Sequence, residues 1–484
     1  MRFSLPRTSR LVALGTALAC AGSVAAASPA SAGPVFRPGS PGVGDPWYPL
    51  EGNGGYDVRH YSLDLAYDPS TRRLDGVVRI RARATQNLSR FDLDLRGLTV
   101  RSVRVNGADA RFTREGQELI ITPRHGLPEG AGFVVTVAYG GEPRPIGGDT
   151  PYGFVPTDDG AVVQNIEDGA STWFPCKDHP SDKATFDFRV RVPQGLGVVA
   201  NGRLVSRRTD GDRTTFAWRE KDPMSTYLAT IDIGKWQVRT GTTPGGIPQY
   251  TAVDPRLEAA RPGSAAFFWK TTAEVTDLWT KTFGPYPFDS TGAIALKVSY
   301  DGKELPFSEE TQTRPVYSQV DSAGTVAHEL AHQWFGDSVG IRGWNEIWLS
   351  EGFATFATWY WDEVKGGRPA AEQARQVYET YPADSPMWQV VLADPKAPDE
   401  NAGPRVYYGG AMALQFLREK IGDERFFALL RAWTAEHRHG TATTRDFAAL
   451  ATRISGQDLS AFFRAWVFGT GRPPLPPAAR RSAR

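Results

Sequence analysis

The spacing of the apolar residues changes part-way along the chain, and this change constrains the fold more than any other feature. In residues 47–237, apolar and charged side chains alternate, most clearly at 78–84 and 186–192. A period of two with one charged face predicts half-buried strands of an antiparallel sheet. Asn-Gly at 106–107 and Asp-Gly at 210–211 are typical of the turns of β-hairpins. This part of the chain is therefore predicted to be all-β.

After residue 237 the apolar residues recur with the spacing of helices. Ser264 is expected to begin the first helix, and Gly284-Pro285 is expected to end it. Helices are predicted at 264–283 and at about 321–336, 346–364, 408–420, 424–437, 444–454 and 458–467. The predicted fold is therefore α+β with several domains: an antiparallel β domain at 47–237 precedes a mainly helical domain at 238–475.

The N-terminal segment differs from the rest of the chain. Basic residues precede a short apolar run at 11–22, and Ala-x-Ala sites follow it. This pattern is typical of a secretory signal peptide, predicted here at 1–32, and the apolar run is too short to span a membrane. The protein is therefore expected to be secreted and extracellular. A Pro/Gly-rich linker is predicted at 33–46 and a disordered tail at 476–484.

Charge and cysteine content exclude several classes of function. The 55 Lys and Arg residues nearly balance the 54 Asp and Glu residues, which gives no electrostatic case for a nucleic-acid partner or an anionic membrane. No later segment is apolar enough for a transmembrane helix. Cys20 falls in the predicted signal peptide, where lipoprotein anchoring is not expected, and Cys176 is then left without a partner for a disulfide. The excess of Arg over Lys is typical of a GC-rich bacterial genome.

One run has the spacing of a metal site. His328 and His332 lie four positions apart, in the pattern His-Glu-x-x-His. On a helix, residues four apart share a face, so both imidazoles can bind one Zn²⁺. Glu329 lies beside them and is predicted to be the general base for a water that the zinc activates. The alternative is a helix whose histidines only satisfy buried hydrogen bonds.

A catalytic zinc site needs a third protein ligand and an open position for water. Glu351 is the candidate, because it lies 19 residues after His332 in Trp-Leu-Ser-Glu-Gly-Phe-Ala. This spacing allows one loop and a return on a second helix that faces the first. Two His and one Glu would hold one Zn²⁺ per chain and leave the fourth position for water. Without the other motif, Glu351 would be predicted to lie on the surface, which is the usual position of Glu.

Together these motifs resemble the aminopeptidase N family of zinc metallopeptidases. The resemblance is carried by 328–336 and 348–354, by the opening strand at 56–65, and by Phe-Pro-Cys-Lys-Asp-His-Pro at 174–180. It implies a saddle-like N-terminal β domain and a thermolysin-like catalytic domain. It also implies a zinc cofactor and removal of single residues from peptide N-termini. Larger members continue with a helical domain that encloses the site, so a more open cleft is expected here.

The resemblance implies further site residues. Tyr407 stands where the family has its oxyanion-stabilising tyrosine, with Tyr408 as a competing neighbour. Glu310 stands where the family has the carboxylate that binds the substrate amine, and Gln164 is expected beside that amine. The Gly, Met and Asn of this family motif are all replaced. Glu309 is a competing carboxylate, and one hypothesis is that it favours basic side chains at the cleaved residue.

Two points remain open in the sequence. Ser350 replaces an Asn common in the family, so the support of a ligating histidine must be rearranged. Thr355, one turn after Glu351, is a candidate for that support.

Two other functions also fit the motifs, namely a zinc endopeptidase of the thermolysin type and an inactive zinc-binding protein of the same fold. Epoxide hydrolysis, known in one branch of the family, has no positive support.

Overall fold

The computed structural model describes residues 34–148, 150–320, 322–396 and 402–475. The predicted signal peptide and the predicted tail lie outside these residues. The strands and helices described below all belong to one compact unit of the chain, which begins at Phe36. None of the helices among the described residues is both long and apolar enough to cross a membrane.

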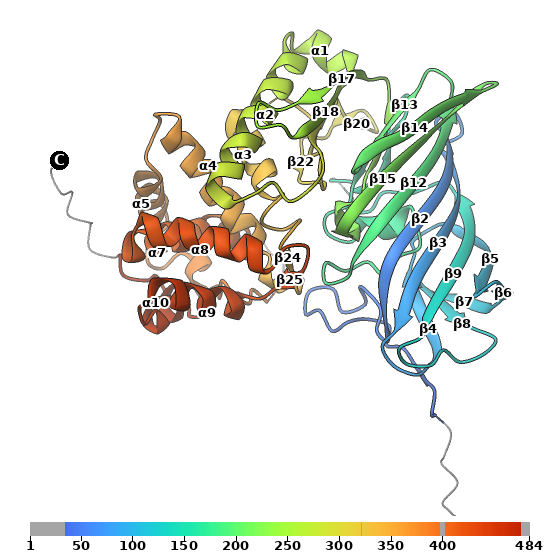
Figure 1. Ribbon diagram of the computed structural model, residues 1–484, viewed down its shortest axis with the longest axis horizontal. Coiled ribbons are helices and arrows are strands. Elements are labelled where there is room, and N and C mark those ends of the chain that lie inside the picture. Colours follow the sequence, from blue (N-terminus) through green and yellow to red (C-terminus); the bar gives the residue numbers. More distant parts are fainter. Residues whose placement is uncertain (1–33, 149, 321, 397–401, 476–484) are drawn as a thin grey trace, which may run out of the picture. The chain divides into compact units, whose positions relative to one another are not determined.

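The N-terminal half is built on an eight-stranded sheet with the order β14-β15-β12-β2-β3-β9-β5-β6 (Figure 1). The predicted alternation is confirmed, because every second side chain is buried along most of β3 and β12. Both predicted hairpins are also present, at the β5–β6 and β14–β15 turns. The strands are β2 (Tyr56–Asp68), β3 (Arg73–Ala84), β5 (Thr99–Val105), β6 (Ala108–Asp109), β9 (Gly132–Gly141), β12 (Lys183–Pro193), β14 (Arg203–Asp210) and β15 (Arg213–Ser225).

The prediction of a purely antiparallel sheet is wrong at one pair. Strands β2 and β12 run parallel, with Phe186 opposite Tyr61 and Phe188 opposite Leu63. More than a hundred residues separate the two strands along the chain, and this long connection lets the chain return in the same direction. Alternation reports which face of a strand is buried but not the direction of its neighbour, so the sequence pattern did not distinguish the two pairings.

Two four-stranded sheets complete the β region, in the orders β1-β4-β8-β7 and β10-β11-β16-β13. Strand β11 matters most for the site, because it ends at Gln164. The strands of the first sheet are β1 (Arg37–Pro38), β4 (Leu88–Asp94), β7 (Arg111–Glu115) and β8 (Glu118–Thr122). Those of the second are β10 (Gly153–Pro156), β11 (Ala161–Gln164), β13 (Gly197–Ala200) and β16 (Ile231–Gly234).

The second half begins with a five-stranded sheet, in the order β17-β18-β19-β23-β22, which the helical prediction did not include. Its strands are short, and those at its centre are buried on both faces, so they show no alternation that would reveal them. They are β17 (Gln237–Thr242), β18 (Pro248–Val253), β19 (Thr291–Ala295), β22 (Ser308–Glu309) and β23 (Val316–Tyr317). Two smaller sheets pair β20 (Ser299–Tyr300) with β21 (Lys303–Glu304) and β24 (Gly340–Ile341) with β25 (Thr441–Ala442).

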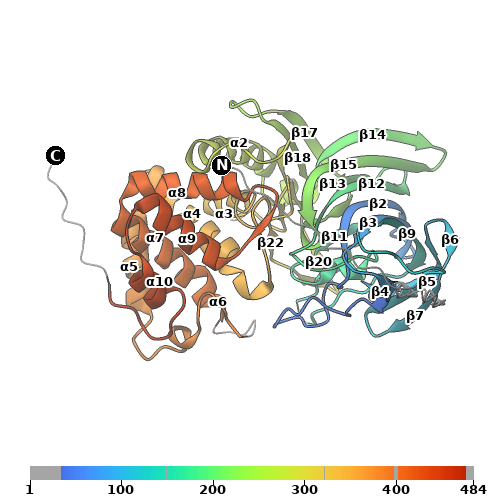
Figure 2. The same ribbon diagram turned by 60° about the horizontal axis from the view of Figure 1, so that its bottom comes forward.

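Helices make up most of the remainder, and α5 to α10 gather in one part of the molecule (Figure 2). The predicted α+β fold, with the β-rich half first, is confirmed. The α-helices are α1 (Pro255–Ala260), α2 (Ser264–Phe283), α3 (Ala323–Ala331), α4 (Trp348–Val364), α5 (Ala370–Thr380), α6 (Ala402–Pro404), α7 (Gly410–Ile421), α8 (Asp423–Glu436), α9 (Thr444–Ser455) and α10 (Ser460–Trp466). A π-helical turn, Arg405–Gly409, joins α6 to α7.

The helix predicted at 321–336 is shorter than expected. It ends at Ala331, and the chain then passes through a tight turn to Gly336, whose φ of 119° favours glycine. Helix α2 has the predicted bounds, whereas α1 and α5 were not predicted. The short α3 still carries the first predicted ligand, and its last turn leads directly into the second.

Candidate metal centre

The three predicted ligands meet between α3 and α4. The Nε2 atom of His328 lies 3.2 Å from Oε2 of Glu351, and Nε2 of His332 lies 3.5 Å from the same oxygen. Ligands bound to a tetrahedral zinc at about 2.0–2.1 Å are separated by about 3.3 Å. The three atoms therefore have the spacing of a zinc coordination shell, and two His with one Glu leave a fourth position for water.

Local sequence explains how α3 presents both histidines. Ser322 caps the helix by accepting a hydrogen bond from the Thr325 amide at 3.2 Å. His332 lies one residue beyond the last helical residue but keeps right-handed helical φ and ψ. The spacing of four residues therefore still places the two rings on one face, with their centroids 4.8 Å apart.

Ser350 orients the second histidine. Its hydroxyl donates to the carbonyl of Phe335 at 3.1 Å and lies 2.9 Å from Nδ1 of His332. With the hydroxyl proton so used, Ser350 accepts from Nδ1–H, which also lies 3.1 Å from the Phe335 carbonyl, and Nε2 of His332 is left free toward Glu351. A Cβ at Gly336 would lie 2.3 Å from the Ser350 oxygen, so glycine is needed there for this approach. Ser350 thus supports the ligating histidine, a role that the sequence analysis did not assign to it.

We expect Ser350→Ala to weaken zinc binding by about 10-fold, because Nδ1–H of His332 then keeps only the Phe335 carbonyl, 3.1 Å away, as an acceptor. Competition titration with a chromophoric chelator measures this affinity directly. The control is Thr355→Val, on the same helix, since the Thr355 hydroxyl has no hydrogen-bond partner among the described residues. Equal zinc affinity in Ser350→Ala and the parent protein would contradict this role.

Thr358, and not the expected Thr355, contacts the first histidine. The His328 ring lies between Glu351 at its Nε2 and the Thr358 hydroxyl, which is 3.5 Å from its Nδ1. This contact is at the long limit of a hydrogen bond, and the hydroxyl also donates to the Ala354 carbonyl at 3.0 Å. His328 is therefore held less firmly than His332.

Glu329 lies on α3 between the two histidines and is 6% exposed. Its carboxylate belongs to a second cluster with Glu310 and His332, in which the ligand atoms lie within 4.8 Å of one another. Burial raises the pKa of Glu329 well above its usual value; His332 opposes this shift, and the carboxylates of Glu310 and Glu351 add to it. A cation at the ligands would favour the ionised form. Glu329 thus has the position and basicity of a group that exchanges a proton.

The π-helical turn places Tyr407 against the ligands. Its ring is nearly parallel to that of His328, with an interplanar angle of 12° and centroids 6.3 Å apart. Although Tyr407 is 39% exposed, the atoms packed around its phenol partly desolvate it and raise its pKa well above the usual value, and the carboxylate of Glu351 raises it further. The phenol therefore keeps its proton and can donate it in a hydrogen bond. Tyr408 instead lies near Tyr381, where it adds to the effect of burial in raising the pKa of that phenol.

A close helix crossing makes this arrangement possible. A Cβ on Gly352 would lie 2.9 Å from the Cα of Gly410, and a Cβ on Gly410 would lie 2.8 Å from the Cα of Gly352. Two glycines therefore let α4 and α7 touch backbone to backbone. Arg405 fixes the start of the π-helical turn by donating to the carbonyls of Val390 and Trp466 at 3.1 and 2.8 Å.

Glu310 faces the same site from the β22–β23 connection. It is 3% exposed, and one of its carboxylate oxygens has no hydrogen-bond partner among the described residues. Gln333, which directly follows the second histidine, positions this segment: it accepts from the Thr313 amide at 2.7 Å and donates to the Glu310 carbonyl at 3.2 Å. Sequence reasoning missed Gln333, although its position beside the motif was a usable signal.

Glu309 and Gln164 lie where β11 meets β22. Glu309 is 1% exposed, and one of its oxygens accepts from the amides of Asn165 and Ile166 at 2.9 and 3.3 Å. Gln164 directly precedes these amides. Glu309 therefore joins the two segments that the sequence assigns to amine binding, and one of its two oxygens is used for this link.

Two family models match the chain. The Peptidase family M1 domain matches residues 301–466, and the Peptidase M1 N-terminal domain matches residues 58–228. The first match includes all three candidate ligands, and the second includes most of the eight-stranded sheet. The chain belongs to the M1 peptidase family. This result confirms the resemblance to the aminopeptidase N family.

Solved structures of M1 enzymes have the same fold. The M1 zinc metallopeptidase from Deinococcus radiodurans has a TM-score of 0.81 at 29% identity, over 90% of this chain and 99% of its own. A mutant of that enzyme bound to a Tyr-Ser-Ala substrate also has a TM-score of 0.81, at 28% identity, over 90% of this chain and 100% of its own.

The curated M1 relatives are longer. Aminopeptidase M1-D of Oryza sativa subsp. japonica is 28% identical over 339 residues, which are 65% of this chain and 37% of the relative. The leucyl aminopeptidase of Saccharolobus solfataricus is 26% identical over 445 residues, which are 86% of this chain and 54% of the relative. The chain thus spans about half or less of the length of these two relatives.

Zinc is the cofactor of this M1 family member. The two-histidine, one-glutamate donor set and its spacing fit a catalytic zinc ion, and the family match agrees with that assignment. The prediction of a zinc cofactor is therefore confirmed.

Proposed function

We propose that this protein is an aminopeptidase that removes N-terminal residues from peptides. The observation that carries the proposal is Glu310, a buried carboxylate beside Glu329 and His332 that has an oxygen without a hydrogen-bond partner among the described residues. A buried carboxylate oxygen without a hydrogen bond is stabilised as an anion by a nearby cation, and the α-ammonium of a peptide would provide that charge next to the scissile bond. The names of the relatives, aminopeptidases of rice and of an archaeon, favour the same activity.

The proposed mechanism assigns one task to each residue. His328, His332 and Glu351 hold the zinc, which when bound polarises the scissile carbonyl and lowers the pKa of the attacking water. Glu329 accepts the proton of that water and returns it to the leaving amine. Tyr407 donates a hydrogen bond to the oxygen on which negative charge develops. Gln164 is assigned to the substrate amine beside Glu310.

The amine anchor separates this proposal from an endopeptidase, which would use the same zinc ligands. A carboxylate that binds a free ammonium close to the scissile bond admits only the first residue of a peptide to the cleavage position. An acetylated N-terminus carries no charge and leaves Glu310 without its partner. An endopeptidase has no such requirement.

The test is hydrolysis of a Leu-peptide with a free N-terminus and of its N-acetyl twin, each with and without a zinc chelator. We expect cleavage of the free peptide only, abolished by the chelator and restored by added zinc. Cleavage of both peptides would point to the endopeptidase instead. Cleavage of neither by zinc-loaded protein, across a panel of Leu, Ala and Arg peptides, would point to an inactive binding protein.

We also propose that the protein is secreted from a bacterial cell. The support is the basic, then apolar, then small-residue pattern of residues 1–32, which precedes the described part of the chain. The N-terminal sequence of protein recovered from the culture medium tests this proposal.

A further inference from the structure

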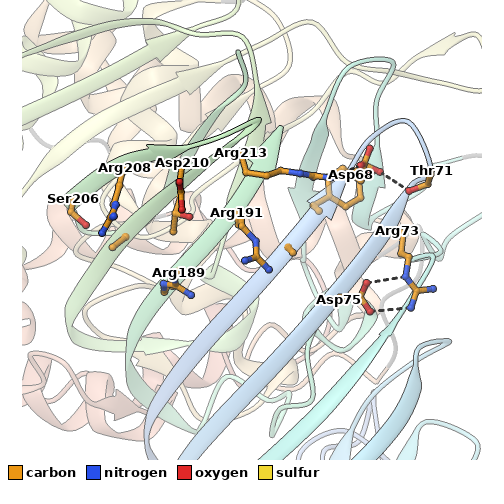
Figure 3. A pocket seen from close by; sticks show the side chains of 14 residues that line it. Asp68, Thr71, Arg73, Asp75, Arg189, Arg191, Ser206, Arg208, Asp210 and Arg213 are labelled. Carbon is orange, nitrogen blue, oxygen red and sulfur yellow. Dashed lines mark hydrogen bonds and ion pairs between the residues drawn. The ribbon is translucent and has the colours of Figure 1, made fainter. Parts of the chain in front are cut away.

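The outer face of the eight-stranded sheet carries a hollow of about 710 Å³ that is lined by five arginines and three aspartates (Figure 3). Its residues come from β2, β3, β12, β14 and β15 and from the turn between β2 and β3. None of them belongs to the metal centre. The hollow is therefore a second candidate binding site, separate in its residues from the proposed peptidase reaction.

The register of the strands explains why the surface is hollow here. Thr215 of β15 pairs with Arg208 of β14 on one side and with Arg191 of β12 on the other. Arg191 in turn pairs with Ala66 of β2, and Ala217 lies two residues beyond Thr215 on β15. Small side chains thus form the floor, and long arginines stand on either side of it. Because alternate residues share a face, these side chains all lie on the outer surface.

Not all of the charge in the hollow is neutralised. Arg73, Arg189 and Arg213 form ion pairs with aspartates at 2.8 to 3.0 Å. Arg191 and Arg208 have no such ion pair within the part of the chain that the structure describes, and neither does Asp210, so these three groups together carry a net charge of +1. Figure 3 shows both guanidinium groups in the hollow, with Arg189 close by. Two exposed cations therefore flank the hydroxyl of Thr215.

We propose that this hollow binds the phosphate groups of an anionic polymer. A guanidinium matches a phosphate by donating two parallel hydrogen bonds, and the Thr215 and Ser206 hydroxyls add neutral donors. The hollow crosses five adjacent strands, a distance of roughly 19 Å, which is longer than a single phosphate needs. Since the whole chain is nearly neutral, the attraction comes from this local arrangement and not from net charge.

The test uses the zinc-loaded protein and fluorescently labelled inorganic polyphosphate, followed by anisotropy. Arg191→Ala/Arg208→Ala is expected to weaken binding by about ten-fold or more. The matched control is Arg425→Ala/Arg445→Ala, which removes two exposed arginines from α8 and α9. This control is expected to bind within about two-fold of the parent protein. Peptide hydrolysis should be unchanged in both variants, which verifies that each is folded.

Orthophosphate serves as the second probe, because it has the same chemistry without the chain. The polymer should bind at least about ten-fold more tightly per molecule, since adjacent phosphates engage Arg191 and Arg208 together. Equal affinity for the two probes, absence of polyphosphate binding, or equal loss in the control variant would each overturn the proposal. None of these outcomes bears on the aminopeptidase proposal, because hydrolysis is measured separately.

Discussion

Glu329→Gln is expected to lower kcat by about 10²- to 10⁴-fold, with zinc and substrate still bound. Glutamine keeps the size of the side chain but cannot accept the proton of the attacking water. Glu329 lies in a cluster with His332 and Glu310. It is not one of the three zinc ligands, the last of which is Glu351, so metal binding should persist. Burial and the neighbouring carboxylates already favour proton uptake by Glu329, and this is the property that the substitution removes.

Single-turnover hydrolysis and metal analysis on the same preparation check this prediction. The control is Glu346→Gln, an isosteric change in the turn before α4, where Glu346 accepts from the Thr444 amide at 2.9 Å. It should keep kcat within a few-fold of the parent protein. A Glu329→Gln enzyme with more than a tenth of the parent kcat and full zinc content would assign the proton transfer to another group.

Two patterns in the sequence were enough to predict the fold class and the cofactor. The alternation along β3 and β12 follows from a sheet with one buried and one solvated face, and the structure has that sheet. The His-Glu-x-x-His spacing and Glu351 placed the metal on two facing helices because helical geometry leaves little freedom once the spacing is known. Both patterns lie within short stretches of the sequence, so they can be recognised without knowing which distant segments contact one another.

The features that the sequence did not predict depend on contacts between distant segments. The direction of β12 beside β2 is set by the path of the chain between them, which no local period records. The Ser350 hydroxyl can approach His332 only because Gly336 has no side chain, which would otherwise overlap with that hydroxyl. Gln333 acts on a loop twenty residues earlier in the chain, at Thr313. In each case the sequence gives the residues themselves but does not show which distant segment they contact.

Glu310→Gln is expected to lower kcat/KM for peptides with a free N-terminus by about 30-fold or more. Removing one partner of a buried charge pair costs about 2–5 kcal/mol, and a neutral amide cannot balance the substrate ammonium. Any residual hydrolysis of the N-acetyl twin, which the parent protein is expected to reject, should be no slower in the variant, because that substrate never uses the charge. The ratio of the two rates should therefore shrink, which distinguishes loss of the anchor from general damage to the site.

The adjacent glutamate provides the control. In Glu309→Gln the amide oxygen can still accept from the Asn165 and Ile166 amides, so the link between β11 and β22 is retained and kcat/KM should change by only a few-fold. If both variants lost activity equally, the amine would be bound by the pair and not by Glu310. If Glu310→Gln kept the parent kcat/KM and still rejected the acetylated peptide, selection for a free N-terminus would come from the shape of the site and not from charge.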